Sequence, residues 1–438
     1  MTASTYQARR RTLADRLPAG DLCLFPANRE APMNYLHNTY PFRQDSTFRY
    51  LAGHNLPDLV LTVEAGGGES KLYGEDFTMD MIVWMGEQPR VRELAETCGA
   101  AYGGTLEQLR QDVCAFENIH YLPPYRASRR EWLSELLGYP PSAPSEALVR
   151  AVVDLRSVKS GEELAEMSRA VRTSMQMHRA AREFAAPGRT EAEVAGLIEG
   201  IAIQAGGRLA YPAIVSKNGH ILHNHYHGNT LSEGDLLLID AGAETDSGYA
   251  GDITRTFAVG TELSDRQRAV YDIVDTAKTR SIGCLSPGIA FAEVHRIACT
   301  IITRGLKELG IMWGDPEEAV AAGAHALFMP HGLGHMIGLD VHDMEDLGED
   351  LVGYDDEFRR SAQFGTRSLR LGRRLREGFA LTVEPGIYFI PALIDQWRAG
   401  GTGKEFIDFE VLEQYRNFGG IRLEDNVAIT RQGHKVLG

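Results

Sequence analysis

The sequence predicts a mixed α/β (α+β) protein with two domains, an α/β domain over residues 1–150 and a duplicated domain over residues 151–438. Three observations support this: the length of 438 residues, a proline-rich segment near residue 140, and a turn-and-helix pattern that recurs further along the chain. A chain of this length exceeds the usual size of one domain. We therefore expect two hydrophobic cores.

The predicted boundary is the segment from Tyr139 to Ser145, which contains three prolines among small polar residues. Such a composition is typical of a surface connection. Ahead of it, apolar runs at 22–25 and 59–63 predict strands, and the pattern over 106–114 predicts a helix. These elements alternate, which indicates an α/β domain.

The second part contains two similar turn-and-helix units. Capping boxes at Ser160 and Thr190, each with glutamate three residues later, predict two helix starts. We expect the first helix to end near residue 186 and the second before residue 206. The pattern around 187–194 recurs 100 positions later at 287–294, and runs at 236–239 and 380–383 predict buried strands. The alternative is chance repetition of a common turn.

Composition excludes several classes of protein. With 43% hydrophobic and 24% charged residues the chain is ordinary for a globular protein, and its net charge of −15 disfavours nucleic acid as a partner. No apolar run approaches the length of a membrane span or follows the basic start as a signal peptide would. We expect a cytoplasmic protein without membrane association, whose five scattered cysteines are reduced.

Four carboxylates lie in or against apolar, strand-like runs. Ionised acids are costly to bury unless positive charge compensates them, and metal ions do so directly. With one imidazole from the 331–335 segment, the donor set suits Mn, Co, Fe or Zn better than calcium. Five side chains exceed the needs of one tetrahedral zinc and favour two divalent cations, although each residue alone could be a cap or a buried polar group. The candidate metal ligands are Asp240, Asp252, His335, Glu384 and Glu424.

These motifs, taken in order, resemble the pita-bread metallopeptidases of the aminopeptidase P and prolidase branch. The matching segments are 239–242, 251–257, 331–335 with 340–343, 382–388 and 420–425. Residues 40–51 are similar to the amino-terminal domain of that branch, which argues against methionine aminopeptidase. The resemblance implies a curved antiparallel sheet flanked by helices, two metal ions, most often Mn, and a homodimer.

The resemblance also implies roles for individual residues. Asp240 would hold the first metal, Asp252 and Glu424 would bridge both, and His335 with Glu384 would complete the second site. Glu384 would also shuttle a proton from the attacking water to the leaving nitrogen. The histidines expected to contact substrate are His223, His331 and His342, the last near the scissile carbonyl and His331 on the proline side. Thr254, Tyr388 and Arg422 would orient carboxylates, and His220, His225 and His227 are expected on a solvated rim.

The substrates implied are short proline-containing peptides, and Arg370 bears on their length. It lies in a long segment between His342 and Glu384 that resembles prolidases, where a fixed guanidinium would bind the free carboxylate of an Xaa-Pro dipeptide. We therefore expect an Xaa-Pro dipeptidase. If Arg370 is only a solvated arginine, the alternative is an aminopeptidase P that acts on longer Xaa-Pro peptides. A third possibility is a peptide-binding member of the fold without activity.

Overall fold

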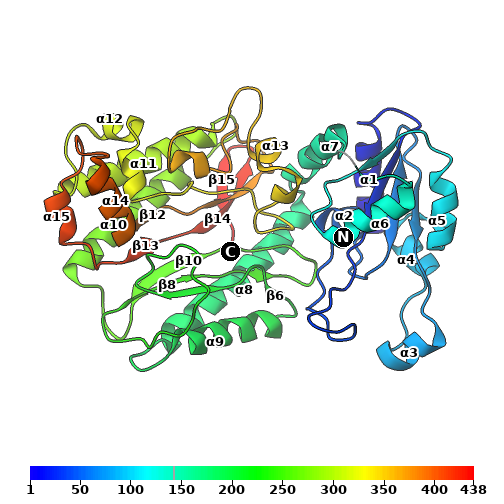
Figure 1. The fold of residues 1–438 in the computed structure, drawn as a ribbon, viewed down its shortest axis with the longest axis horizontal. Coiled ribbons are helices and arrows are strands. Elements are labelled where there is room, and N and C mark those ends of the chain that lie inside the picture. Colours follow the sequence, from blue (N-terminus) through cyan, green and yellow to red (C-terminus); the bar gives the residue numbers. More distant parts are fainter. Residues whose placement is uncertain (142–143) are drawn as a thin grey trace. The chain divides into compact units, whose positions relative to one another are not determined.

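The computed structural model describes residues 1–141 and 144–438. Residues 142–143, the middle of the expected connection, lie outside the described residues. The chain divides into two compact units (Figure 1). The first contains Met1–Arg156 and Asp346–Leu351, and the second contains Ser157–Glu345 and Val352–Gly438.

The first unit is built on a five-stranded mixed sheet with the order β4-β3-β2-β1-β5. Strand β1 pairs antiparallel with β2 and parallel with β5. The expected strands and helix are confirmed to within one residue. The strands are Leu22–Pro26 (β1), Val60–Glu64 (β2), Ser70–Tyr73 (β3), Ala101–Gly104 (β4) and Ile119–Tyr121 (β5), and the helices are Ala3–Ala14 (α1), Ser46–Ala52 (α2), Met79–Met85 (α3), Val91–Cys98 (α4), Leu106–Val113 (α5), Ala127–Leu137 (α6) and Glu146–Ser157 (α7).

The second unit contains the two helix pairs that the repeat predicts. Helices α8 (Gly161–Phe184) and α9 (Glu191–Gln204) form one pair, and α10 (Asp265–Gly283) and α11 (Phe291–Glu308) form the other. Both predicted capping boxes are present. In each pair a Pro-Gly turn precedes the second helix, and the two glycines, 100 positions apart, have φ angles of 91° and 92°. The duplication is therefore a property of the fold and no chance repetition.

The strands of the second unit all pair antiparallel. One sheet has the order β10-β8-β7 and another β11-β14-β15, while β12 pairs with β13 and β6 with β9. The strands are Arg208–Leu209 (β6), Ile214–Lys217 (β7), Leu236–Asp240 (β8), Ala243–Glu244 (β9), Thr254–Ala258 (β10), Ala380–Val383 (β11), Gly386–Tyr388 (β12), Gly420–Arg422 (β13), Asp425–Thr430 (β14) and Gly433–Val436 (β15). The shorter helices are Pro316–Ala321 (α12), Glu349–Gly353 (α13), Pro391–Gly400 (α14) and Phe409–Glu413 (α15), with 3-10 turns at Ala324–Leu327 (η1), Glu345–Leu347 (η2) and Thr366–Ser368 (η3).

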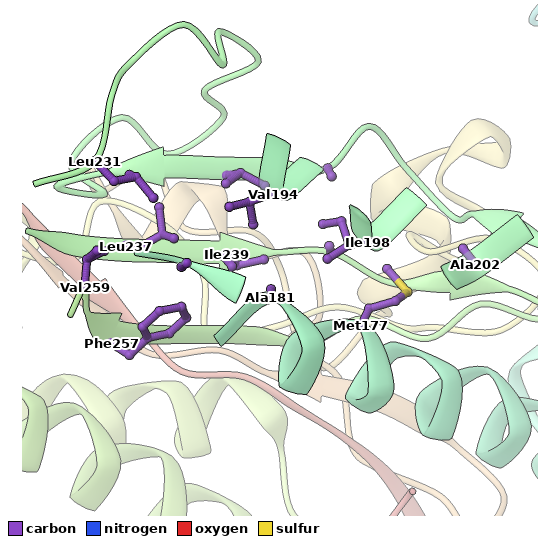
Figure 2. Close-up of a cluster of buried hydrophobic side chains, with 14 of the residues drawn as sticks. Met177, Ala181, Val194, Ile198, Ala202, Leu231, Leu237, Ile239, Phe257 and Val259 are labelled. Atoms are coloured by element: carbon purple, nitrogen blue, oxygen red, sulfur yellow. The ribbon is translucent and has the colours of Figure 1, made fainter. Parts of the chain in front are cut away.

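Strand β8 separates a hydrophobic core from the candidate site. Leu237 and Ile239 pack with side chains of α8 and α9 in one buried cluster (Figure 2). Leu238 packs instead with Tyr388. Because successive side chains of a strand point to opposite faces, Asp240 shares the face of Leu238. Burial of the apolar residues on one face thus presents the carboxylate on the other.

Two further expectations concern cysteines and membranes. All five cysteines are free, and three of them are buried. Among the described helices, none combines the length and apolar character needed to cross a bilayer.

Candidate metal centre and active site

The four candidate carboxylates lie at the ends of strands. Asp240 is the last residue of β8, Asp252 precedes β10, and Glu384 follows β11. Glu424 lies between β13 and β14. Asp240 is part of a strand and the other three lie directly beside strands, so the expectation of acids in or against strands is confirmed. At a strand end the backbone turns away from the ladder, which lets side chains from separate strands converge.

These acids line one cavity of about 670 Å³ in the second unit. The structure brings together there all five candidate metal ligands and most of the other predicted site residues. Thr254 and Tyr388 are fully buried and lie behind this surface. The predicted residues that line the cavity are Asp240, Asp252, His335, Glu384, Glu424, His223, His331, His342, Arg370 and Arg422.

His335 is at the centre of the carboxylates. Its Nε2 lies 3.3 Å from Asp252 Oδ2 and 3.7 Å from Glu384 Oε1. Its Nδ1 lies 2.9 Å from the carbonyl oxygen of Met336, which accepts the Nδ1 proton. This leaves Nε2 directed at the carboxylates, the orientation that a metal-binding imidazole needs once a cation displaces the Nε2 proton. Ligand atoms of Asp252, His335 and Glu424 all lie within 4.8 Å of one another.

The carboxylates of Glu424 and Asp240 differ in how many of their oxygen atoms accept hydrogen bonds from the protein. Thr254 Oγ1 donates a hydrogen bond of 2.7 Å to Glu424 Oε2, whereas Glu424 Oε1 is buried without a partner among the described residues. Asp240 accepts from Tyr211 at 2.6 Å and from Arg422 at 2.5 Å. Tyr211 also donates to Asp252. Glu424 is thus open to a further positive partner, while Asp240 is held in position by its neighbours.

The pKa values reflect acids crowded in a buried site. Burial raises the pKa of Glu384 to about 7, with nearby Asp252 and Asp240 adding to it against His335 and Arg422. Burial and the same acids raise the pKa of Glu424 well above its ordinary value. Burial opposes the charge of His335, but the hydrogen bond to Asp252 and the charge of Glu384 prevail and raise its pKa to about 9. The centre therefore lacks positive charge that would balance its carboxylates.

This donor set fits divalent cations. The unpartnered Glu424 Oε1 would gain a partner, and the carboxylates that now repel one another would gain compensating charge. Carboxylate oxygens with one imidazole suit first-row divalent ions. The residues present therefore match the metal site that the sequence predicts.

A chain of hydrogen bonds fixes His331 in a neutral form. Arg422 Nη1 donates to Tyr388 Oη at 2.7 Å, and that hydroxyl lies 3.1 Å from His331 Nε2. His331 Nδ1 lies 2.8 Å from the Gly332 carbonyl oxygen, so Nδ1 donates and Nε2 accepts. Burial, together with the charge of Arg422, lowers the pKa of His331 to about 3. With both nitrogens engaged, the ring offers the cavity a largely apolar surface.

His342 and Arg370 are joined through Glu345. His342 stacks on His335 with ring centroids 3.7 Å apart, and its Nδ1 lies 2.9 Å from Glu345 Oε1. Arg370 Nη1 lies 2.5 Å from Glu345 Oε2. The guanidinium thus lines the cavity as expected, but it is paired with an internal carboxylate. Any substrate carboxylate would compete with Glu345 for it.

The histidines of the 220–227 segment differ in whether they line the cavity. His223 and His225 are exposed and both line the cavity, although His225 was expected only on a solvated rim. His227 Nε2 lies 3.1 Å from the Ala213 carbonyl oxygen, which gives it a structural partner. His220 is not among the described residues that line the cavity.

Three site residues were not anticipated from the sequence. Tyr211 contacts two carboxylates, Glu345 joins His342 to Arg370, and Asn426 pairs with both backbone groups of Asp252. Glu345 had a local signal, because it follows His342 by three residues. Tyr211 had none, since its partners are 29 and 41 positions away.

The fold and the cavity together define a metal-dependent hydrolase. Comparison with known families agrees: residues 165–431 match the model described as metallopeptidase family M24, and residues 6–118 match that of the aminopeptidase P amino-terminal domain. The chain belongs to metallopeptidase family M24. The predicted pita-bread catalytic domain and its amino-terminal α/β domain are confirmed.

Individual relatives extend over nearly the whole chain. An Escherichia coli Xaa-Pro aminopeptidase is 33% identical, covering 99% of this chain and 93% of its own. The human Xaa-Pro dipeptidase is 28% identical, covering 99% and 90%. Among solved structures, a proline aminopeptidase P II from Yersinia pestis has a TM-score of 0.83 at 33% identity, covering 100% and 96%. A zinc-substituted E. coli aminopeptidase P in complex with product has a TM-score of 0.83 at 31% identity, covering 100% and 95%.

Proposed function

We propose that this chain hydrolyses the peptide bond before proline and removes the first residue from Xaa-Pro peptides. The observation that carries this is the convergence of five metal-ligand side chains on one cavity of an M24 fold. The bacterial relatives described above are named Xaa-Pro aminopeptidase or aminopeptidase P. A mere peptide-binding role is disfavoured, because the complete ligand set would have no use in it.

In this proposal Asp240, Asp252, His335, Glu384 and Glu424 hold two divalent cations. When bound, these cations would polarise the scissile carbonyl and lower the pKa of the attacking water. Manganese is the proposed ion, with cobalt, zinc or iron as substitutes, and a relative was solved in a zinc-substituted form. Thr254, Arg422 and Tyr388 hold the carboxylates in register through the hydrogen bonds described above.

Glu384 moves the proton. Its carboxylate lies at the cavity surface beside His335. A carboxylate in this position can accept a proton as general base and then release it as general acid. It takes the proton of the attacking water and delivers it to the leaving proline nitrogen. That nitrogen must be protonated, because an amide anion is a poor leaving group.

His342 and His223 face the substrate carbonyl. Glu345 accepts the Nδ1 proton of His342, which fixes the ring at the cavity wall where the substrate carbonyl would bind. His223 lies on another, exposed segment that lines the same cavity. His331 forms the wall for the proline ring, since its two nitrogens are already engaged within the protein.

Substrate length separates the first candidate from a second. The sequence favoured an Xaa-Pro dipeptidase, but the comparisons with named aminopeptidases support the longer substrate better. Two observations keep the dipeptidase as second candidate: Arg370 lines the cavity, and the human dipeptidase aligns over 99% of this chain. The pairing of Arg370 with Glu345 argues for the first candidate, because a substrate carboxylate would have to compete with Glu345 for the guanidinium.

The test is a parallel assay of the pure protein with added Mn²⁺ on Ala-Pro and on Ala-Pro-Ala. Faster release of alanine from the tripeptide supports the aminopeptidase, and faster cleavage of the dipeptide supports the second candidate. An Ala-Ala-Ala control should not be cleaved at a comparable rate. Failure to cleave any Xaa-Pro peptide would refute the proposal.

We further propose a cytoplasmic homodimer. Helix α3 supports association, because Met79, Val83 and Trp84 are exposed on it and patches of this kind mark contact surfaces. Light scattering of the purified chain measures the mass, and a monomer at micromolar concentration would contradict this part.

A further inference from the structure

A second cluster of ligand-type side chains lies outside the residues that line the cavity. His295 and Cys299 lie one turn apart on α11, and His325 lies on η1. All three are buried, with at most 3% of each exposed. One ligand atom from each lies within 4.8 Å of the others. The proposed peptide hydrolysis uses none of them.

His325 lacks the partners that a buried imidazole needs. Within residues 1–141 and 144–438 neither ring nitrogen makes a hydrogen bond of good geometry, and the Val320 backbone is the one polar group near enough to act on the pKa of the ring. A neutral imidazole carries one donor and one acceptor, and buried polar groups are nearly always paired. The hydroxyl of Thr303, one turn beyond Cys299 on α11, is also buried without a partner in the described chain. Unpaired nitrogens beside a thiol indicate a missing ligand.

The separation of Cys299 and His295 matches that around one metal ion. Cys299 Sγ lies 3.6 Å from His295 Nε2. A tetrahedral cation with bonds of about 2.3 Å to sulfur and about 2.0–2.1 Å to nitrogen places those two atoms about 3.6 Å apart. His325 lies edge to face with His295, with ring centroids 6.3 Å apart, and offers a ligand atom within 4.8 Å of the other two.

The charge states also suit a metal ion. Burial lowers the pKa of His295 to about 3 and of His325 to about 4, so both rings are neutral and each has a lone pair to offer. Burial raises the pKa of the Cys299 thiol. The bond to the cation must therefore overcome this preference for the thiol: the proton leaves to solvent and the cation binds the thiolate.

We propose that His295, Cys299 and His325 bind one thiophilic metal ion, copper(I) or zinc(II), at a structural site distinct from the peptidase centre. One thiolate with two imidazoles is a donor set for such ions. Copper(I) leaves the loaded site neutral, which suits its burial, whereas zinc(II) leaves one positive charge and calls for a fourth ligand. The ion ties α11 to η1, which is followed by the segment that carries His331.

The test detects metal–sulfur bonds. The peptidase centre cannot give this signal, because its proposed ligands are oxygen and nitrogen atoms. The full-length protein is produced in minimal medium supplemented with copper or with zinc and purified under reducing conditions. Metal per chain is quantified, and X-ray absorption at each metal edge reports whether a sulfur atom is bonded. We expect one sulfur per sulfur-bound ion in at least one of the two preparations.

Matched variants assign the signal. Cys299→Ser and His325→Gln should each lose at least nine-tenths of the sulfur-bound metal, whereas Cys23→Ser, an equally buried cysteine in the first unit, should retain it. Absence of metal–sulfur bonding from both wild-type preparations overturns the proposal, and so does its persistence in Cys299→Ser. The wild-type result decides the question even if a variant fails to fold. Peptidase activity is not a readout, so failure here leaves the proposed hydrolysis untouched.

Discussion

Glu384 is the residue on which the chemistry depends most. Replacing it by glutamine keeps the size of the side chain but removes its ability to carry a proton. We expect turnover of an Xaa-Pro tripeptide to fall by roughly 10²- to 10⁴-fold, the usual contribution of a general base. Circular dichroism should show an unchanged fold. Wild-type turnover in this variant would exclude the shuttle role.

Three ligands make metal binding depend on pH. Glu384, with its raised pKa of about 7, holds a proton below that pH, and His335, with a pKa of about 9, holds one over a wider range. The pKa of Glu424 is also raised well above its ordinary value. A cation must displace these protons. We therefore expect the affinity of the metal-free protein for Mn²⁺ to increase as pH rises through about 7 and again toward 9. Titration calorimetry at several pH values measures this, and an affinity independent of pH would contradict the assigned ligands.

Arg370 decides between the two substrate lengths. If it only supports Glu345 and His342, Arg370→Ala should lower kcat/KM for dipeptide and tripeptide by similar factors. Arg367→Ala, an exposed neighbour, should leave both unchanged and is the control. If Arg370 binds the substrate carboxylate, kcat/KM should fall for the dipeptide alone. The expected decrease is roughly 10- to 100-fold, which corresponds to the loss of one hydrogen bond to a charged group. That second outcome would assign the chain as a dipeptidase.

At the residue scale the sequence predicted the candidate metal ligands, which the structure brings together, and the supporting residues Thr254, Tyr388 and Arg422. It did not predict every contact of the site. Asp240, Asp252 and Glu424 were recognisable because each stands beside an apolar run or glycine in a family pattern. The pairing of Arg370 with Glu345 was not foreseen, because it depends on how a long irregular segment folds back toward the cavity. Tyr211 was missed for the same reason: no local pattern reports a contact with two acids on other elements.

At the scale of elements, the repeat makes a prediction about helix α11. Thr190 caps α9 with its side chain, whereas Ala290, at the equivalent position, caps α11 without one. Glu293 is already in place to complete a capping box. Ala290→Ser should therefore raise the unfolding free energy, and Thr190→Ala should lower it, each by about 0.5–2 kcal/mol. Denaturant titration measures both, and destabilisation by Ala290→Ser would show that the buried site lacks room for the hydroxyl.

Helices and strands were predictable where local signals were strong. Capping boxes predicted the starts of α8 and α9, and uninterrupted apolar runs predicted strands β8 and β11. The short strands β12 and β13 had no such signal, because each has only three residues and depends on its pairing partner. The Pro-Gly repeat predicted the duplication, since both glycines must adopt a positive φ that few other residues tolerate.

In the whole molecule, distant segments converge on the proposed pair of catalytic cations. The ligands come from β8, from residues near β10 and β11, from the 331–335 segment and from the turn before β14, so no short segment binds the metals alone. Protein stripped of metal should be inactive and should regain activity as Mn²⁺ is added. The Asp252→Ala variant should not regain it.

The most direct measurement is Mn²⁺ bound per chain, followed together with tripeptide cleavage during this titration. Activity should reach its maximum as the second Mn²⁺ binds to each chain. Full activity in the metal-free protein, or full recovery in Asp252→Ala, would contradict it.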